Sequence, residues 1–359
     1  MCIPFKEVEV GKITIMPGMF GGPDYPEFDY PVSHKENYHA NMRGQGYWVP
    51  TSNDIIWFCP SVYPDNAAKG NVHEAVKMPR EKLGGPDMFG IEWTYQADIG
   101  GSTVRPGTPL LSNANEWKDL VKFPDINTWA WEESIRLNTD YLKDGGRLVN
   151  TVICTGWFER LISFMDFAQA ALALIDKKQR QAVNELFETL SDFYIKVIDK
   201  YLASFPGLIH GITVHDDWGS QQGQMISDKT LREVFLPPIK RVVDHIHSKG
   251  LYADMHNCGR IDKVMPILSE IGFDRLEVMP LVDRDNFYRN YGDRMMLTYT
   301  PDAPPAEATD EYYEEVARDF VDKYFNKGRL VLLETYYQPM PMAFLKELYI
   351  YSRKKSGTF

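Results

Sequence analysis

His256 and Cys258 are the two residues whose types and spacing most clearly allow chemistry. Side chains two positions apart on a strand point to the same side, so an imidazole nitrogen and a thiolate at this spacing can bind one Zn²⁺ ion. The tripeptide His-Asn-Cys is a weak motif by itself, and a buried cysteine beside a hydrogen-bonded histidine is the alternative interpretation. Its place at the end of a predicted strand favours a metal site.

A third metal ligand has to come from elsewhere in the chain, because no cysteine follows Cys258. Cys59 and Cys154 are the thiol candidates, and Glu334 and Glu277 are the carboxylate candidates. We favour Glu334, because it ends an apolar predicted strand, where an unpaired carboxylate is costly to bury. An ion pair between Glu334 and a nearby arginine is the alternative.

A second polar group, His215 followed by Asp216 and Asp217, ends another predicted strand. Adjacent carboxylates shift each other's pKa, so one of them can hold a proton near neutral pH and act as a general acid. We predict that Asp216 has this role, with His215 as the other catalytic candidate, whereas Asp217 can cap the next segment. Aromatic residues beside the strand ends are candidate walls of a substrate pocket, with packing in the core as the favoured alternative for each one taken singly: Trp157, Phe158, Trp218, Tyr299 and Tyr336.

Repeated units of amphipathic helix, glycine and short apolar strand position these residues after residue 127. Glycine commonly ends a helix, because it adopts the left-handed conformation without a Cβ clash. The predicted helices span 133–143, 181–204, 229–249, 261–271 and 310–327, and the predicted strands span 147–154, 208–214, 251–255, 273–279, 295–299 and 329–333. Pro237 and Pro238 should kink or interrupt the third of these helices.

The alternation of helices and strands implies a parallel sheet. We predict a (β/α)8 barrel of the TIM type, because the glycine-rich loop typical of an open doubly wound sheet is missing; an open sheet is the alternative. Residues 127–359 would form the barrel, and residues 1–126 would be an N-terminal extension that caps it within the same structural domain. That extension contains short β-like runs at 46–49 and 55–59 and a predicted hairpin over 89–107. The polar residues end one predicted strand after another, and such strand ends carry the chemistry of barrel enzymes.

The net charge of −11 excludes nucleic acid and anionic membrane surfaces as favoured partners. Four irregularly spaced cysteines argue against a disulfide framework and for a reducing compartment. The N-terminus carries no apolar signal segment, and no run approaches the roughly 20 apolar residues of a membrane span, so we expect a cytoplasmic protein. A homodimer is an open alternative to a monomer.

The stretches HDDWGSQQGQMIS and FLPPIKRVVDHIHSKGLYADMHNCGRIDKVMPILSEIGFDRLEV resemble the uroporphyrinogen decarboxylase superfamily, and within it the corrinoid-dependent methyltransferase branch. The segments DMFGIEW, VRPGTPLL, EWKDLVKFPDINTW and GWFERLISFMDFAQAALALI extend the resemblance to about residues 85–335. It implies a (β/α)8 barrel and a zinc site in which His256 and Cys258 match the His-x-Cys pair of the methyltransferases.

The sequence departs from that branch at the later zinc-binding cysteine, where it has Glu334-Thr335-Tyr336. Carboxylate in place of sulfur makes a harder Lewis acid, which suits an ether oxygen as leaving group. The resemblance therefore implies an enzyme that moves a methyl group from a small methoxylated, aromatic substrate to the cobalt of a corrinoid (cobalamin) carried by a partner protein. The departure is also compatible with a site that holds no zinc.

Two other functions remain open. A uroporphyrinogen-decarboxylase-like enzyme would need no metal, but the arginine-rich N-terminal segment that binds the porphyrinogen carboxylates in those enzymes has no counterpart here. A non-catalytic relative that only binds a corrinoid protein is the other alternative, and the polar residues at the strand ends argue against it.

Overall fold

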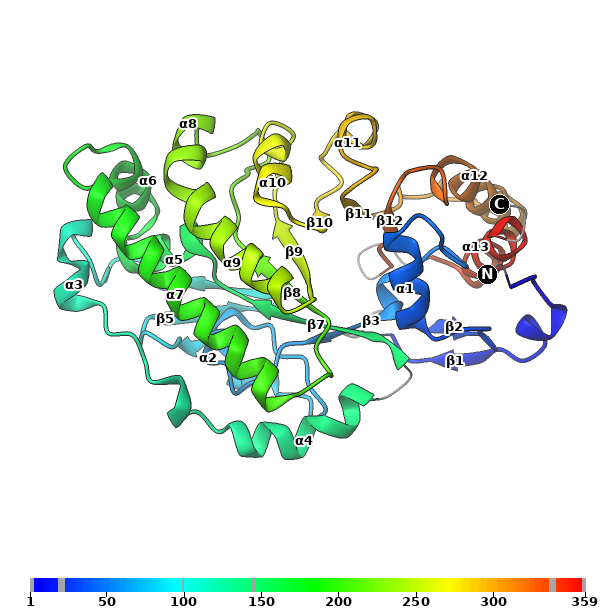
Figure 1. Ribbon diagram of the computed structural model, residues 1–359, viewed down its shortest axis with the longest axis horizontal. Coiled ribbons are helices and arrows are strands. Elements are labelled where there is room, and N and C mark those ends of the chain that lie inside the picture. The colour runs from blue at the N-terminus through cyan, green and yellow to red at the C-terminus, as the bar shows by residue number, and fades with distance from the viewer. Residues whose placement is uncertain (1–2, 19–22, 99, 144–145, 336–339, 357–359) are drawn as a thin grey trace. The chain divides into compact units, whose positions relative to one another are not determined.

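Helices alternate with parallel strands in the computed structural model, which describes residues 3–18, 23–98, 100–143, 146–335 and 340–356 (Figure 1). The chain forms two units. Unit 1 consists of Met1–Ile56, Asp144–Leu148 and Asp274–Phe359, and unit 2 consists of Trp57–Lys143 and Val149–Phe273. Each unit is described by itself below.

Three parallel strands form the centre of unit 2: β7 (Leu148–Ile153), β8 (Gly211–His215) and β9 (Tyr252–Asn257). Most of their residues are buried on both faces, as is typical of a parallel sheet covered by helices. The register places Ile153 opposite Val214 and His215 opposite His256, so the carboxyl ends of neighbouring strands lie side by side. The strand β3 (Ile55–Phe58) leads from unit 1 into unit 2, where Thr151 Oγ1 donates to the Phe58 carbonyl.

The helices of unit 2 lie around these strands; α2–α4 precede β7 in the chain, and α5–α10 follow β7, β8 or β9 (Figure 1). They are α2 (Pro64–Lys69), α3 (Trp117–Leu120), α4 (Trp131–Lys143), α5 (Trp157–Met165), α6 (Phe167–Ile175), α7 (Arg180–Ser204), α8 (Asp228–Thr230), α9 (Leu236–Ser248) and α10 (Met265–Ile271). The helix α7 packs against α9, and α9 packs against β9. Gly250, with φ of 73°, follows α9 in the left-handed conformation that the sequence pattern predicted.

Two prolines interrupt the long helix predicted over 229–249. A π-helical turn, η8 (Leu231–Phe235), precedes α9, and Leu236 N–H bonds to the Leu231 carbonyl five residues back. Pro237 and Pro238 then occupy the first turn of α9, where a missing N–H costs no hydrogen bond. The predicted interruption is confirmed.

An antiparallel sheet in unit 2 contains β4 (Gly85–Pro86), β5 (Glu92–Gln96) and β6 (Gly101–Val104). Trp93 pairs with Val104 and Gln96 with Gly101, so the predicted hairpin within 89–107 is confirmed.

Unit 1 contains the other parallel strands, β10 (Arg275–Val278), β11 (Met296–Tyr299) and β12 (Val331–Leu333). Leu333 N–H donates to the Pro50 carbonyl, and Thr51 bridges Leu333 in the parallel sense, so the chain just before β3 pairs with β12. The remaining elements of unit 1 are β1 (Thr14–Met16), β2 (Tyr25–Glu27), α1 (His34–Met42), α11 (Arg284–Asn290), α12 (Asp310–Tyr324) and α13 (Met342–Ser356).

A buried network of charged side chains is centred on His34, the first residue of α1. His34 Nδ1 lies 2.6 Å from Asp54 Oδ1, and His34 Nε2 lies 2.8 Å from Glu27 Oε1. Burial alone would lower the pKa of His34, but the two carboxylates outweigh it and raise the pKa to about 9. Arg147 completes the network through Glu27 Oε2 at 2.7 Å.

The predicted α/β fold of the TIM-barrel type is confirmed. The strands β3, β7–β9 and β10–β12 number seven among the described residues, and every pair of them with a defined register is parallel. The predicted β-like run at 46–49 is wrong, because those residues are irregular, and α11 was not predicted. The proposed boundary near residue 127 falls inside unit 2. Within the described ranges, no helix has the length and apolar composition needed to cross a bilayer.

Candidate metal site

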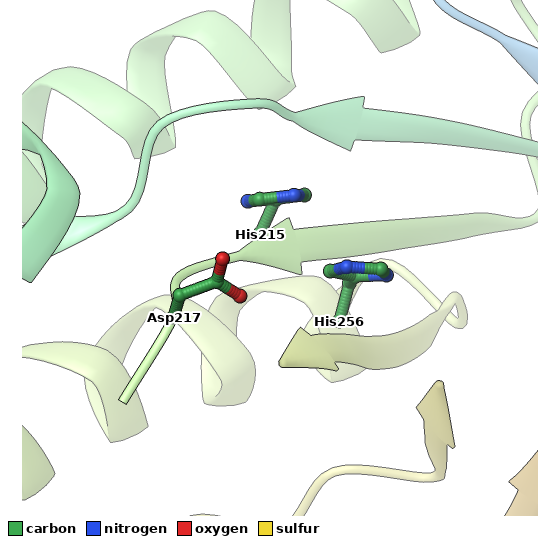
Figure 2. Close-up of side chains that lie close together, drawn as sticks. All are labelled: His215, Asp217 and His256. Carbon is green, nitrogen blue, oxygen red and sulfur yellow. The ribbon is translucent and has the colours of Figure 1, made fainter. Parts of the chain in front are cut away.

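The carboxyl ends of β8 and β9 bring two histidines face to face. His215 ends β8 and lies opposite His256 in the parallel register. The imidazole rings stack with their centroids 4.4 Å apart and their planes 12° from parallel (Figure 2). Adjacent positions on neighbouring strands therefore present ring nitrogens to the same space.

Asp217 adds a carboxylate to the two imidazoles. One ligand atom from each of His215, Asp217 and His256 lies within 4.8 Å of the other two, and all three residues are partly exposed (Figure 2). The Cys258 backbone N–H donates to Asp217 Oδ1 at 2.6 Å and so fixes the carboxylate. We call these three residues, together with Cys258, the β8–β9 cluster.

Cys258 lies beside His256, as the two-residue spacing predicted. The distance between Cys258 Sγ and His256 Nε2 is 3.4 Å, and Cys258 is a partly buried free cysteine. The same spacing relates His215 to Asp217, so the rule that paired His256 with Cys258 could have identified Asp217 as well. Ligation of a metal by these residues stays a prediction.

Glu159 supports His215 from the first turn of α5. Its Oε2 atom lies 2.9 Å from His215 Nδ1, and its Oε1 atom accepts a 2.8 Å hydrogen bond from Lys69 Nζ at the end of α2. Burial alone would raise the pKa of Glu159, but Lys69 and His215 outweigh it and hold the pKa at about 2. Sequence reasoning gave neither residue a role. Glu159 stands in the run that follows the strand near residue 150, but nothing in the sequence shows that it meets His215, and Lys69 stands at the end of a helix.

Asp216, the predicted general acid, holds the start of α5, and its part in proton transfer stays a prediction. It is fully buried, and its carboxylate accepts four hydrogen bonds, from the backbone N–H groups of Trp157, Phe158 and Glu159 and from the indole of Trp218. Burial and the nearby Glu159 raise the pKa of Asp216 to about 7, and the donors oppose this rise. Gly156 permits the approach, since a Cβ there would lie 2.4 Å from Asp216 Cβ. Of the two adjacent carboxylates, only that of Asp217 is partly exposed to solvent.

Three of the predicted pocket walls lie in the core of unit 2. Trp157, Phe158 and Trp218 are at most 1% exposed. The Trp157 ring packs edge-on against Tyr194, and both Phe158 and Trp218 pack against Phe235. Their large apolar surfaces stabilise the interior, so we do not retain them as substrate contacts.

The other predicted site residues belong to unit 1. The Tyr299 hydroxyl accepts a 2.8 Å hydrogen bond from Arg284, whose guanidinium also lies 4.2 Å from the ring centroid. Glu277 is a partly buried residue of β10, and Glu334 is 3% exposed just after β12. Tyr336 lies outside the described residues. The roles of Glu277 and Glu334 as ligands stay predictions.

The donor set of the β8–β9 cluster fits Zn²⁺. Two imidazole nitrogens, a carboxylate oxygen and a thiol sulfur are all groups that bind zinc, and a His₂-carboxylate set leaves a coordination position for substrate. Partial exposure of the three principal residues gives that position access to solvent. Asp217 is therefore a candidate carboxylate ligand within unit 2, in addition to the predicted Glu334 and Glu277.

The family model described as uroporphyrinogen decarboxylase (URO-D) matches residues 69–303, well over half of the chain. The chain belongs to the uroporphyrinogen decarboxylase family. The match includes Lys69, Glu159 and the whole β8–β9 cluster, so the candidate site lies within the family region. The superfamily resemblance predicted from the sequence is thereby confirmed.

Several solved structures are similar to this family member at low sequence identity. An endo-β-1,4-xylanase from Gloeophyllum trabeum is 12% identical, with a TM-score of 0.37 over 63% of this chain and 82% of that one. The IOLI protein with a bound zinc atom is 10% identical, with a TM-score of 0.32 over 64% and 81% of the two chains. A D-psicose 3-epimerase is 12% identical, with a TM-score of 0.30 over 68% and 83%. No curated protein matches the sequence.

Proposed function

We propose that this protein is a zinc-dependent methyltransferase of the uroporphyrinogen decarboxylase family. It takes a methyl group from a small methoxylated, aromatic molecule and transfers it to the cobalt of a corrinoid carried by a partner protein. The observation that supports this proposal is the convergence of His215, Asp217 and His256 within 4.8 Å. A decarboxylase that works without metal would have no need for two imidazoles and a carboxylate at this spacing.

Zinc bound at the β8–β9 cluster would supply a Lewis acid for the ether oxygen of the substrate. The chain's own residues hold that site in shape. Glu159 orients His215, and the Cys258 N–H orients Asp217. Asp216 anchors the helix that carries Glu159 and so acts through it rather than on the substrate.

The test measures metal content and methyl transfer in the same preparations. We expect the purified protein to carry about one zinc per chain and to methylate cob(I)alamin from at least one member of a panel of methoxyaromatics and methylamines. His256→Ala and Cys258→Ser should lose both properties. Equal zinc in wild type and variants, or full methyl transfer by the variants, would contradict the proposal. Release of CO₂ from a porphyrinogen by zinc-free protein would instead identify a decarboxylase.

A further inference from the structure

We infer that Glu159 is a positioning residue that fixes which ring nitrogen of His215 faces the metal, and that Lys69 balances its charge. The inference rests on the proposed metal site and deepens it. It concerns two residues that lie behind the β8–β9 cluster and carry none of its ligand atoms.

The two oxygens of Glu159 are divided between two partners. Oε2 lies 2.9 Å from His215 Nδ1, and Oε1 lies 2.8 Å from Lys69 Nζ. The side chains of Glu159 and Lys69 are 12% and 13% exposed, so water competes little for either contact. Lys69 Nζ also lies 5.0 Å from the centroid of the Trp93 ring. Glu159 therefore has one defined position.

A carboxylate in that position selects one tautomer of His215. Neutral imidazole carries a single N–H, and an ionised carboxylate can only accept a hydrogen bond. The proton therefore belongs on Nδ1, and the lone pair belongs on Nε2, where it is available to a metal. Stacking on the His256 ring at 4.4 Å fixes the plane of the same imidazole. The hydrogen bond therefore selects the ligand atom, and the ring stack restrains the plane of the imidazole.

Lys69 neutralises the charge of the Glu159 carboxylate. The ammonium and the carboxylate carry opposite charges, so the pair adds no net charge to the space around the ligands. Replacement of both residues by uncharged side chains therefore keeps the charge balance and removes only the acceptor for His215. This property gives a matched control, because a buried ion pair can be exchanged for apolar groups at little cost in stability.

The experiment compares three proteins: wild type, Lys69→Met/Glu159→Leu, and Lys69→Met/Glu159→Gln. The first double variant removes the acceptor, and the second restores a neutral amide oxygen at the same place. Proteins labelled with ¹⁵N-histidine report the tautomer of His215 in the metal-free state, with His215→Gln assigning its signals. Competition with a chromogenic chelator gives the zinc dissociation constant, and thermal melting checks that all variants fold.

We expect metal-free wild type to show the Nδ1–H tautomer, and the Leu variant to show a mixture with the Nε2–H form. Zinc affinity should fall roughly 10- to 100-fold in the Leu variant and recover in part in the Gln variant. The same tautomer in all three proteins, or zinc affinities within about threefold of one another, would overturn the inference. If wild type binds zinc but transfers no methyl group, only the proposed reaction fails. If wild type binds no zinc, the proposed site fails, while the tautomer comparison still decides the role of Glu159.

Discussion

His215 and His256 lie opposite each other on adjacent parallel strands, and their rings stack 4.4 Å apart. The strand β8 ends at His215 and β9 ends at Asn257, and Asp217 and Cys258 each lie two positions beyond one of the histidines. The candidate site is thus a product of strand register. A one-residue slip between β8 and β9 would separate the two imidazoles and leave no shared space for a metal ion.

The first prediction concerns Asp217, which the structure places in the site. Asp217→Asn keeps the shape but removes the charge, so we expect zinc affinity to fall at least tenfold, because a neutral amide is a poorer zinc ligand than a carboxylate. Zinc titration of the purified variant measures this effect. His247→Ala, a change at an exposed histidine near the end of α9, is the control and should bind zinc like wild type. Wild-type affinity in Asp217→Asn would remove Asp217 from the site.

The second prediction separates a structural from a catalytic role for Asp216. Asp216→Asn replaces a carboxyl group that accepts four hydrogen bonds with an amide that must turn an N–H group toward some of the same donors. We expect a loss of about 2–4 kcal/mol in the free energy of unfolding, measured by urea denaturation. Unchanged stability with abolished methyl transfer would instead restore Asp216 as a proton donor.

The third prediction concerns Trp157. Its indole N–H donates to the Phe187 carbonyl and to Ser191 Oγ, and its ring is fully buried. Trp157→Ala should cost about 3–5 kcal/mol in the free energy of unfolding, because it opens a large cavity. If Trp157→Ala melts like wild type and raises only the KM for the methyl donor, Trp157 is a pocket wall after all.

The fourth prediction is a pH dependence that arises in unit 1. The folded state raises the pKa of His34 from 6.5 to about 9, so the protonated ring stabilises the fold. This contribution is fully present below pH 6.5 and disappears as the pH rises through 9, a change on the order of 3 kcal/mol. Urea denaturation at a series of pH values measures it. His34→Gln should remove the decline between pH 6.5 and 9, and a decline of equal size in that variant would assign it to another group.

The repeating part of the fold could be predicted from sequence because its signals are local. Apolar periodicity defined α7, and a following glycine marked the end of α9. The doubled proline indicated the break before α9 for a steric reason that needs no tertiary information. The strand prediction over 46–49 was wrong because Trp48 and Val49 are buried without being paired in a strand. Buried apolar residues in a short run look like a strand in the sequence even when they form none.

The candidate site could be predicted only in part, because half of it depends on contacts between distant segments. His215, His256 and Cys258 were identifiable at strand ends. Glu159 and Lys69 are 90 positions apart and meet only when α2 and α5 are in place. The choice between Asp216 and Asp217 as the carboxylate of the site depended on side-chain direction. Neighbouring residues on an extended chain point to opposite sides, and only Asp217 points to the same side as His215.

The four hydrogen bonds to Asp216 also have a consequence for the interpretation of mutational screens. Loss of that carboxylate would free the first turn of α5, which carries Glu159, the hydrogen-bond partner of His215. A survey that scores only activity would therefore rank Asp216 with the residues that touch substrate, although it is sealed from solvent. Scoring protein abundance alongside activity would separate loss of the fold from loss of chemistry in variants of Asp216.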